Sequence, residues 1–210
     1  MAGIHTVPAI LFPILAIMYE VLLDNINRKV TLSAEEQEVI KTCFVPKKIR
    51  KKQYVLQAGE ACKHILFVEK GLLRTYYTDD NGGEHTVQFA PENWWISDMY
   101  SFLTNEPSLY NITALEDTEA LMLSNGTFEE MVTKVPKMER YLRILMQNNL
   151  VALQRRITGA LSDSTEEKYT RFTKTYPDIV NRVPQHIIAT YIGLTPETLS
   201  RIRKQLLHKK

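Results

Sequence analysis

The stretch from Pro184 to Leu207 constrains the fold of this 210-residue chain more than any other. Its apolar spacing predicts two short helices joined by a tight turn. Pro184 suits the start of the first helix, and Gly193 suits its end, where the backbone needs a left-handed residue. Thr195 is placed to cap the second helix, whose first residue is then Pro196. These signals together predict a helix-turn-helix.

The second helix of this pair has two distinct faces. Leu199, Ile202 and Leu206 share one side at helical spacing, and polar residues occupy the other. A polar ridge of this kind can lie in a DNA major groove and read base edges. The predicted DNA-binding residues are Thr195, Pro196, Glu197, Thr198, Ser200, Arg201 and Lys204. The alternative is a helical hairpin with a solvated face, but the small Ala189 before the turn allows close helix crossing and favours DNA binding.

Charge is divided unevenly along the chain. The whole carries a formal net charge of +2, with 26 Lys and Arg against 24 Asp and Glu. From Leu150 onward there are 11 basic and 5 acidic residues, which leaves 15 basic and 19 acidic residues in the remainder. A basic C-terminal third on a slightly acidic body indicates a separate nucleic-acid-binding module. Double-stranded DNA is therefore the predicted partner.

The N-terminal residues and the two cysteines limit other readings. Residues 1–17 are apolar without Lys or Arg, lack the basic region of a secretory signal, and are interrupted by Pro8 and Pro13. We expect an extension outside the fold, with a membrane-associating tail as the alternative. Cys43 and Cys62, without a CxxC pair, indicate reduced thiols in a cytoplasmic protein.

Short strands punctuated by turns fill the middle of the chain. We expect strands near residues 49–59, 65–71, 72–78, 84–89, 111–115 and 119–123, with Asp79–Gly83 as a hairpin turn. This rhythm predicts a small β-sandwich or barrel. Helices are expected on both sides of it, two of them opened by the capping boxes that begin at Ser33 and Ser164.

One long helix is expected from Lys137 to about Leu161. It carries two apolar stripes, which usually means two packing partners. One partner would be the β-domain, and the other a second copy of the chain. The predicted dimer-interface residues are Tyr141, Ile144, Asn148 and Val151. The alternative is a helix buried within one domain.

The glycine-punctuated strands, the long helix and the motif from Arg182 to Arg203 resemble the cAMP-receptor-protein/FNR (Crp/Fnr) family of bacterial transcription regulators. The resemblance implies an α+β chain: an N-terminal cyclic-nucleotide-binding-like jelly roll, a dimerisation helix and a C-terminal winged helix-turn-helix. It implies a homodimer on a two-fold symmetric operator that acts through RNA polymerase. Base-contacting positions of the family fall on Glu197 and Arg201, whereas a third falls on Pro196, which has no side-chain donor.

The effector region departs from the family pattern. Cyclic-nucleotide binders carry a Gly-Glu pair and later an Arg that pairs with the phosphate, but Ser97 and Asp98 stand near the first and Ser108 near the second. No Arg or Lys occurs between Arg74 and Lys134. A buried phosphate without a cation is costly, so we expect no tight binding of cAMP. The predicted lining of a pocket for another, unidentified effector is Trp94, Trp95, Asp98, Tyr100 and Tyr110. Alternatively, the aromatic residues pack the core or a loop.

The remaining function classes find little support. No P-loop, Gly-x-Ser-x-Gly elbow or clustered metal ligands occur, so we predict no enzyme, no metal and no cofactor. The rival to a DNA-binding regulator is a ligand-sensing jelly roll whose helical tail contacts a protein. The predicted organisation is an effector domain at 18–135, a dimerisation helix at 136–161 and a DNA-binding domain at 162–210.

Overall fold

The computed structural model describes residues 19–208, with side chains as far as Leu206. The predicted extension at residues 1–17 lies outside the described residues. The helices are α2 (Glu20–Asn27), α3 (Ala34–Cys43), α4 (Met99–Thr104), α5 (Asn125–Lys134), α6 (Lys137–Ser162), α7 (Thr165–Thr175), α8 (Ile179–Arg182), α9 (Gln185–Ile192) and α10 (Pro196–His208). The strands are β1 (Val45–Ile49), β2 (Tyr54–Leu56), β3 (His64–Lys70), β4 (Leu73–Thr78), β5 (Glu84–Ala90), β6 (Trp95–Ile96), β7 (Asn111–Ala114) and β8 (Thr118–Ser124).

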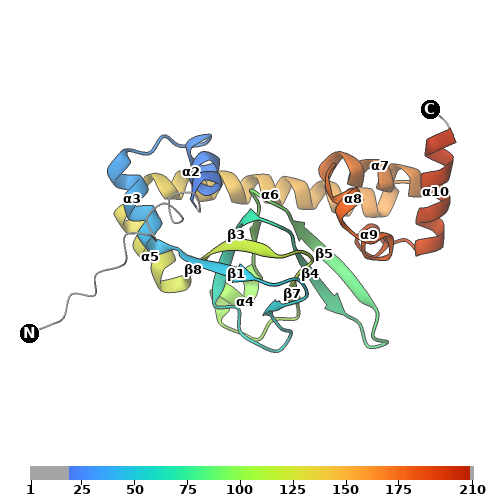
Figure 1. Cartoon of the computed structure of the whole chain (residues 1–210), viewed down its shortest axis with the longest axis horizontal. Helices are drawn as coiled ribbons and strands as arrows, with labels where there is room; N and C mark the ends of the chain where they lie inside the picture. The colour runs from blue at the N-terminus through green and yellow to red at the C-terminus, as the bar shows by residue number, and fades with distance from the viewer. Residues whose placement is uncertain (1–18, 209–210) are drawn as a thin grey trace, which may run out of the picture.

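The strands form two antiparallel sheets, which confirms the predicted jelly-roll type of β-domain. One sheet has the order β1-β8-β3-β6, and the other has the order β2-β7-β4-β5. Buried apolar side chains from both sheets, including Leu66, Leu73 and Ile112, fill the space between them. Figure 1 shows α6 running the length of the molecule beside this domain, with α2, α3 and α5 at one end and α7 to α10 at the other.

Local sequence signals determine several element boundaries. Ser33 and Ser164 each accept a hydrogen bond from a backbone N–H three residues on, and the glutamate there accepts one in return, so both predicted capping boxes are confirmed. Helix α5 begins at Asn125, because Ser124 forms a further capping box with Thr127.

Two expectations about the elements need correction, and two short elements were not expected. The single strand expected at residues 49–59 is two strands, β1 and β2, which belong to different sheets. The turn between them places Lys52 in the left-handed region, with φ of 69°. The short β6 and α4 were not expected. No strand lies among residues 125–208, so the expected wing is absent from the described chain: residues 176–184 form α8 and short connections instead.

The N-terminal end of α6 belongs to the core of the β-domain. Met138 and Tyr141 are fully buried in a cluster with α2, α3, β3 and β8. Further along, the helix leaves this core, and large apolar side chains such as Leu150 and Ile157 are exposed. The helix therefore has one buried half and one half whose apolar side chains face solvent in the single chain.

Candidate DNA-binding surface and its junction with the β-domain

Helices α9 and α10 meet at the predicted turn. Gly193 has φ of 74°, the left-handed conformation that a helix end favours and that glycine adopts without a Cβ clash. Its N–H and that of Leu194 both donate to the carbonyl of Ala189. Thr195 then caps α10, its hydroxyl accepting from the backbone N–H of Thr198 at 3.2 Å. Local residues therefore determine where one helix ends and the next begins.

Helix α10 holds its polar ridge outward by burying its other face. Leu199 is fully buried and Ile202 is 6% exposed, both against α7 and α9. Glu197, Arg201 and Lys204 are exposed. Among the other predicted DNA-binding residues, Thr195 and Pro196 are exposed, and Thr198 and Ser200 are half-buried. All seven thus lie on one helix and its cap, around one accessible ridge.

Two members of this ridge have local polar contacts. Glu197 has a lowered pKa, first because its own backbone N–H donates to the carboxylate and second because the Thr195 hydroxyl does so. It is therefore an acceptor at neutral pH. Arg201 donates from Nη2 to the Thr198 hydroxyl at 3.3 Å, which leaves most of its fork of donors available. An acceptor and a forked donor one helical turn apart suit base edges.

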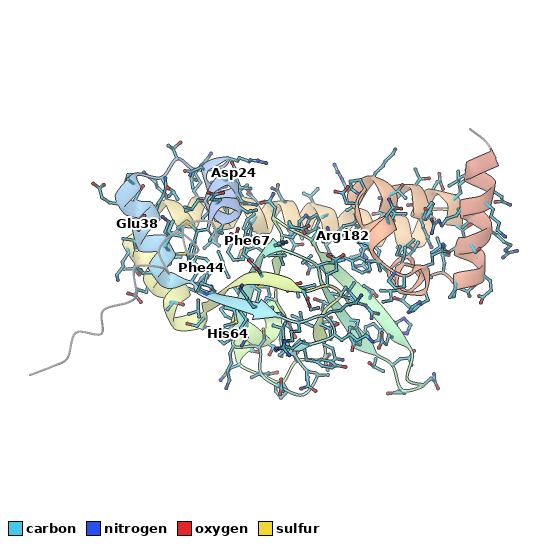
Figure 2. The ribbon with its side chains drawn as sticks, in the orientation of Figure 1. Asp24, Glu38, Phe44, His64, Phe67 and Arg182 are labelled. Carbon is cyan, nitrogen blue, oxygen red and sulfur yellow. The ribbon has the colours of Figure 1, made fainter. Side chains whose placement is uncertain are left out.

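The C-terminal module is attached to the β-domain by Arg182 (Figure 2). Its Nε and Nη2 donate to Glu116 at 3.0 and 2.7 Å, and its Nη1 and Nη2 donate to Glu92 at 2.8 and 3.0 Å. Nη2 also donates to the carbonyl of Gly71 at 3.1 Å. The pKa of Arg182 is raised by its bonds to Glu116 first and Glu92 second. One cation thus bonds three separate segments of the β-domain, and we call this the Arg182 clamp.

An aromatic cluster lies behind the clamp. Phe89 of β5 is fully buried and contacts the rings of Phe172, Tyr176 and Tyr191 at centroid distances of 6.1, 5.9 and 5.3 Å. Leu72, also from the β-domain, is buried in the same cluster. The apolar core of the helix-turn-helix module is therefore completed by residues from the sheet.

Polar contacts flank this cluster on β5. Arg156 of α6 donates to the carbonyls of Val87 and Thr86, and its guanidinium lies 4.3 Å from the centre of the Tyr191 ring. The hydroxyls of Thr86 and Thr190 are 2.6 Å apart. Helix α9 is thereby held against β5.

One arginine bridges the break between α6 and α7 at Ser162 and Asp163. Arg171 donates from Nε to Asp163 at 2.9 Å and forms an ion pair of 2.6 Å with the same carboxylate. It also donates to the carbonyl of Arg155 at 3.0 Å. The end of α6 and the start of α7 are therefore held together across the break.

The four predicted dimer-interface residues are not equivalent. Tyr141 is a correction: it is fully buried within its own chain, donating to Asn25 at 2.8 Å and accepting from the Trp95 indole at 2.9 Å. Its aromatic body fills the core between α2 and the sheet, so it does not face outward. Ile144 is half-buried, and Asn148 and Val151 are exposed.

The five predicted effector-pocket residues lie in different surroundings. Trp94 packs on Tyr176 of the C-terminal module with ring centroids 5.3 Å apart. Trp95 is in the core with Phe67 and Tyr141, and Tyr100 is 62% exposed on α4. Tyr110 is half-buried in the loop before β7, and Asp98 caps α4. The structure does not bring these side chains around one cavity.

Asp98 and Ser108, the residues expected near the family's ribose and phosphate positions, contact each other. Asp98 is 6% exposed and accepts from the backbone N–H of Ser101 at 3.2 Å. Its other oxygen accepts from the Ser108 hydroxyl at 2.7 Å. The two side chains therefore satisfy each other.

A cleft of about 440 Å³ opens elsewhere on the β-domain. Its lining is Val55, Leu56, Glu60, Ala61, Cys62, Lys63, His64, Leu66, Ile112 and Met122. The pKa of His64 is lowered, chiefly by burial and then by the charges of Lys63 and Lys47. None of the five predicted pocket residues contributes to this cleft.

Sequence reasoning did not assign a role to Arg182 or to its acidic partners. Glu92 and Glu116 each follow a strand, but 24 residues separate them, so their meeting depends on the sheet. The sequence feature that could have pointed to this contact is Arg182 itself, a single arginine directly before Val183 and Pro184, which precede α9. Phe89 was assigned to a strand, without any sign that its ring enters the other module.

The fold and this surface define a class: a cyclic-nucleotide-binding-type β-domain followed by a long helix and a helix-turn-helix. Comparison with known proteins agrees. Residues 46–135 match the cyclic nucleotide-binding domain family. The chain is 27% identical over 165 residues to the "Probable transcriptional regulator flp" of Lacticaseibacillus casei, with 74% of each chain covered. It is 25% identical over 184 residues to the regulatory protein HlyX of Actinobacillus pleuropneumoniae, covering 82% of this chain and 76% of that one.

The solved catabolite activator protein of Thermus thermophilus has the same fold, with a TM-score of 0.54 at 20% identity over 88% of this chain and 87% of that one. Together these likenesses support a Crp/Fnr family transcription regulator. Its curated relatives are regulators rather than enzymes. Among residues 19–208, no helix is long and apolar enough to cross a membrane, and no three His, Cys, Asp or Glu side chains group as metal ligands would.

Proposed function

We propose that two copies of this chain bind a two-fold symmetric operator, each placing α10 in a major groove. The observation that carries the proposal is the ridge of α10, which keeps Glu197, Arg201 and Lys204 exposed while Leu199 and Ile202 anchor the helix. The two recognition helices would lie about one helical turn of DNA apart, roughly 34 Å. The bound regulator would then act on RNA polymerase.

Arg201 is the residue proposed to read sequence, through paired bonds to guanine. After selection of an operator from random DNA, we expect Arg201→Ala to weaken binding by about 1–3 kcal/mol and relax specificity at one position. Arg203→Ala is the matched control, since Arg203 is half-buried on another side of the same helix. If Arg201→Ala and wild type bind the selected operator with equal affinity, Arg201 does not read its sequence.

Dimerisation is proposed along α6, on a face offset from the predicted one. Met146, Leu150, Leu153 and Ile157 follow the 3.5-residue spacing of a helix seam, and each is at least half exposed. The side chains expected at the interface include one large exposed apolar residue, Val151. The row from Met146 to Ile157 exposes more apolar surface than the predicted interface does, and a dimer along this row would bury that surface. This supports the row as the dimer seam.

Sedimentation of two variants tests the seam. Leu153 and Val151 have similar exposure, 50% and 45%, but lie on different sides of α6. We expect Leu153→Asp to shift the protein toward monomer, since it buries a charge in the interface, and Val151→Asp to leave the dimer intact. If Val151→Asp gives monomer and Leu153→Asp stays a dimer, the interface is the one predicted from the sequence. A wild-type protein that is monomeric under DNA-binding conditions would contradict the dimer proposal.

The effector, if the protein uses one, is proposed not to be cAMP. Ser108 stands near the expected position of the phosphate-binding arginine and donates its hydroxyl to Asp98, which supports the proposal. Calorimetry with cAMP should therefore give no heat of tight binding. Micromolar or tighter binding would overturn this part of the proposal.

A further inference from the structure

The cleft of about 440 Å³ in the β-domain has an apolar interior. Its lining includes Leu66 of β3, in one sheet, and Leu56 and Ile112 of β2 and β7, in the other. These three side chains are almost fully buried, and we call them the apolar floor. Sites for small molecules have volumes of about 300–1,000 Å³ and mostly apolar walls. The cleft therefore has the size and the interior of such a site.

Basic groups surround the mouth of this cleft. Lys63 is exposed, His64 is half-buried, and both line the cleft. After burial, the charges of Lys63 and of Lys47 on β1 contribute to lowering the pKa of His64, so the three groups lie close enough to repel one another. Within residues 19–208, none of the three takes part in an ion pair, and the His64 ring makes no hydrogen bond. Unpaired like charges of this kind attract an anion.

The loop that carries these groups is held in place by the segment around α4. The backbone N–H of Ser108 donates to the carbonyl of Glu60 at 2.9 Å, and that of Cys62 donates to the Ser101 hydroxyl at 2.8 Å. The carboxylate of Glu60, the acidic member of the lining, accepts from the backbone N–H of Gln57 at 3.2 Å. The mouth of the cleft is thus preformed, and its carboxylate is engaged within its own loop.

The cleft is separate from the positions expected for a nucleotide. The side chains of Asp98 and Ser108 bond each other, and neither residue lines the cleft. Its lining contains no residue of α6. Figure 2 shows His64 well apart from Arg182, so a ligand at His64 would not touch the Arg182 clamp.

We propose that this cleft binds a monocarboxylate with a hydrocarbon tail. The tail would cover the apolar floor, and the carboxylate would accept hydrogen bonds from the Lys63 ammonium and the His64 ring. Because the pKa of His64 is lowered from 6.5, its ring is neutral at pH 7 and donates through one nitrogen. The two groups then present one formal positive charge to one negative charge. Charge-assisted hydrogen bonds of this kind are stronger than neutral ones.

Calorimetry with three probes tests the site. Octanoate has both the tail and the charge, octanamide is its neutral isostere, and acetate lacks the tail. We expect octanoate to bind, octanamide to bind about tenfold more weakly, and acetate to bind about a hundredfold more weakly or less.

Three variants locate the binding. Lys63→Met keeps the aliphatic stem but removes the charge, so it should weaken octanoate about tenfold and leave octanamide unchanged. Lys70→Met, exposed at the other end of β3, is the matched control and should bind octanoate like wild type. Val55→Phe adds volume at a half-buried position of the lining and should weaken both octanoate and octanamide about tenfold or more.

Each of four results would overturn the proposal: no binding of octanoate at millimolar concentration, equal affinity for octanamide and octanoate, an equal loss in Lys63→Met and Lys70→Met, or unchanged octanoate binding in Val55→Phe. The measurements contain no DNA. Their outcome is therefore independent of whether the chain binds an operator.

Discussion

The β-domain is covered by helices at two ends, and the two junctions are built differently. At the N-terminal end, Tyr141 is fully buried and bonds Asn25 and Trp95 in an enclosed network. At the C-terminal end, the Arg182 side chain is 24% exposed and its partners Glu92 and Glu116 are 39% and 32% exposed. One junction is closed to water, whereas the other keeps its ionic contacts at the surface.

This difference indicates which junction is able to open. A buried network leaves unpaired polar groups when it is broken, so it separates only with global unfolding. A partly exposed ion cluster exchanges its bonds for water at little cost. We therefore expect movement of the DNA-binding module to occur at the Arg182 clamp, while the N-terminal helices stay with the sheet.

The largest expected effect concerns the enclosed junction. Tyr141→Ala should lower the free energy of unfolding by about 3–5 kcal/mol, through a cavity and unpaired Asn25 and Trp95 groups. Denaturant unfolding measures this loss. Tyr77→Ala, at a 40% exposed position, is the control and should change stability little. A small effect at Tyr141 would mean that this junction is as loose as the other.

A pH dependence of opposite sign should separate the two junctions. Glu69 accepts from the N–H groups of Val21 and Leu22 at the start of α2, yet burial raises its pKa from 4.5 to about 7. The folded state therefore holds a proton that the unfolded chain releases earlier. Stability should fall by about 2–3 kcal/mol as pH rises from 5 to above 8.

Glu92 behaves in the other direction. Burial is the largest single effect and raises the pKa of Glu92. The hydrogen bonds and the charge of Arg182, together with backbone hydrogen bonds, lower it by more, so the net pKa lies below the ordinary value. The clamp should thus weaken as pH falls below about 4.5.

Unfolding curves test the role of Glu69. The stability of Glu69→Gln should be flat between pH 5 and 8, whereas Glu129→Gln, an exposed control, should keep the wild-type slope. An unchanged slope in Glu69→Gln would assign the dependence to other groups.

The smallest effect on stability is expected at the clamp. Arg182→Met keeps the aliphatic stem but removes five hydrogen bonds to the β-domain. Because these groups are partly exposed, unfolding free energy should fall by only about 1–2 kcal/mol. Amide hydrogen exchange in α8 and α9 should nevertheless accelerate markedly. Lys174→Met, exposed on α7, is the control. Unaltered exchange in α9 would show that the aromatic cluster alone holds the module.

Features governed by local rules could be predicted from the sequence. The left-handed turn at Gly193, the cap at Thr195 and both capping boxes depend on residues within a few positions of one another. The two faces of α10 follow from helical periodicity. These features define the candidate DNA-binding surface, which explains why the structure gathers its predicted residues on one ridge.

Features that depend on distant pairings could not be predicted. The stripe containing Tyr141 reads equally well as a dimer seam or as a core contact, and only the position of Asn25 and Trp95 decides between them. Trp94 and Trp95 are adjacent in sequence, but alternation along an extended segment sends their rings to different modules. The supposed pocket was a group of neighbours in sequence rather than in space.

The position of Phe89 has a practical consequence for dissecting this protein. Its ring, with Leu72, covers Phe172, Tyr176 and Tyr191. A fragment that begins near residue 162 would keep the recognition helix but leave those three rings facing water. Such a patch favours self-association. DNA-binding measurements on the isolated C-terminal fragment would then report aggregation, and grafting α7 to α10 onto another protein would require a substitute for one phenylalanine of the sheet.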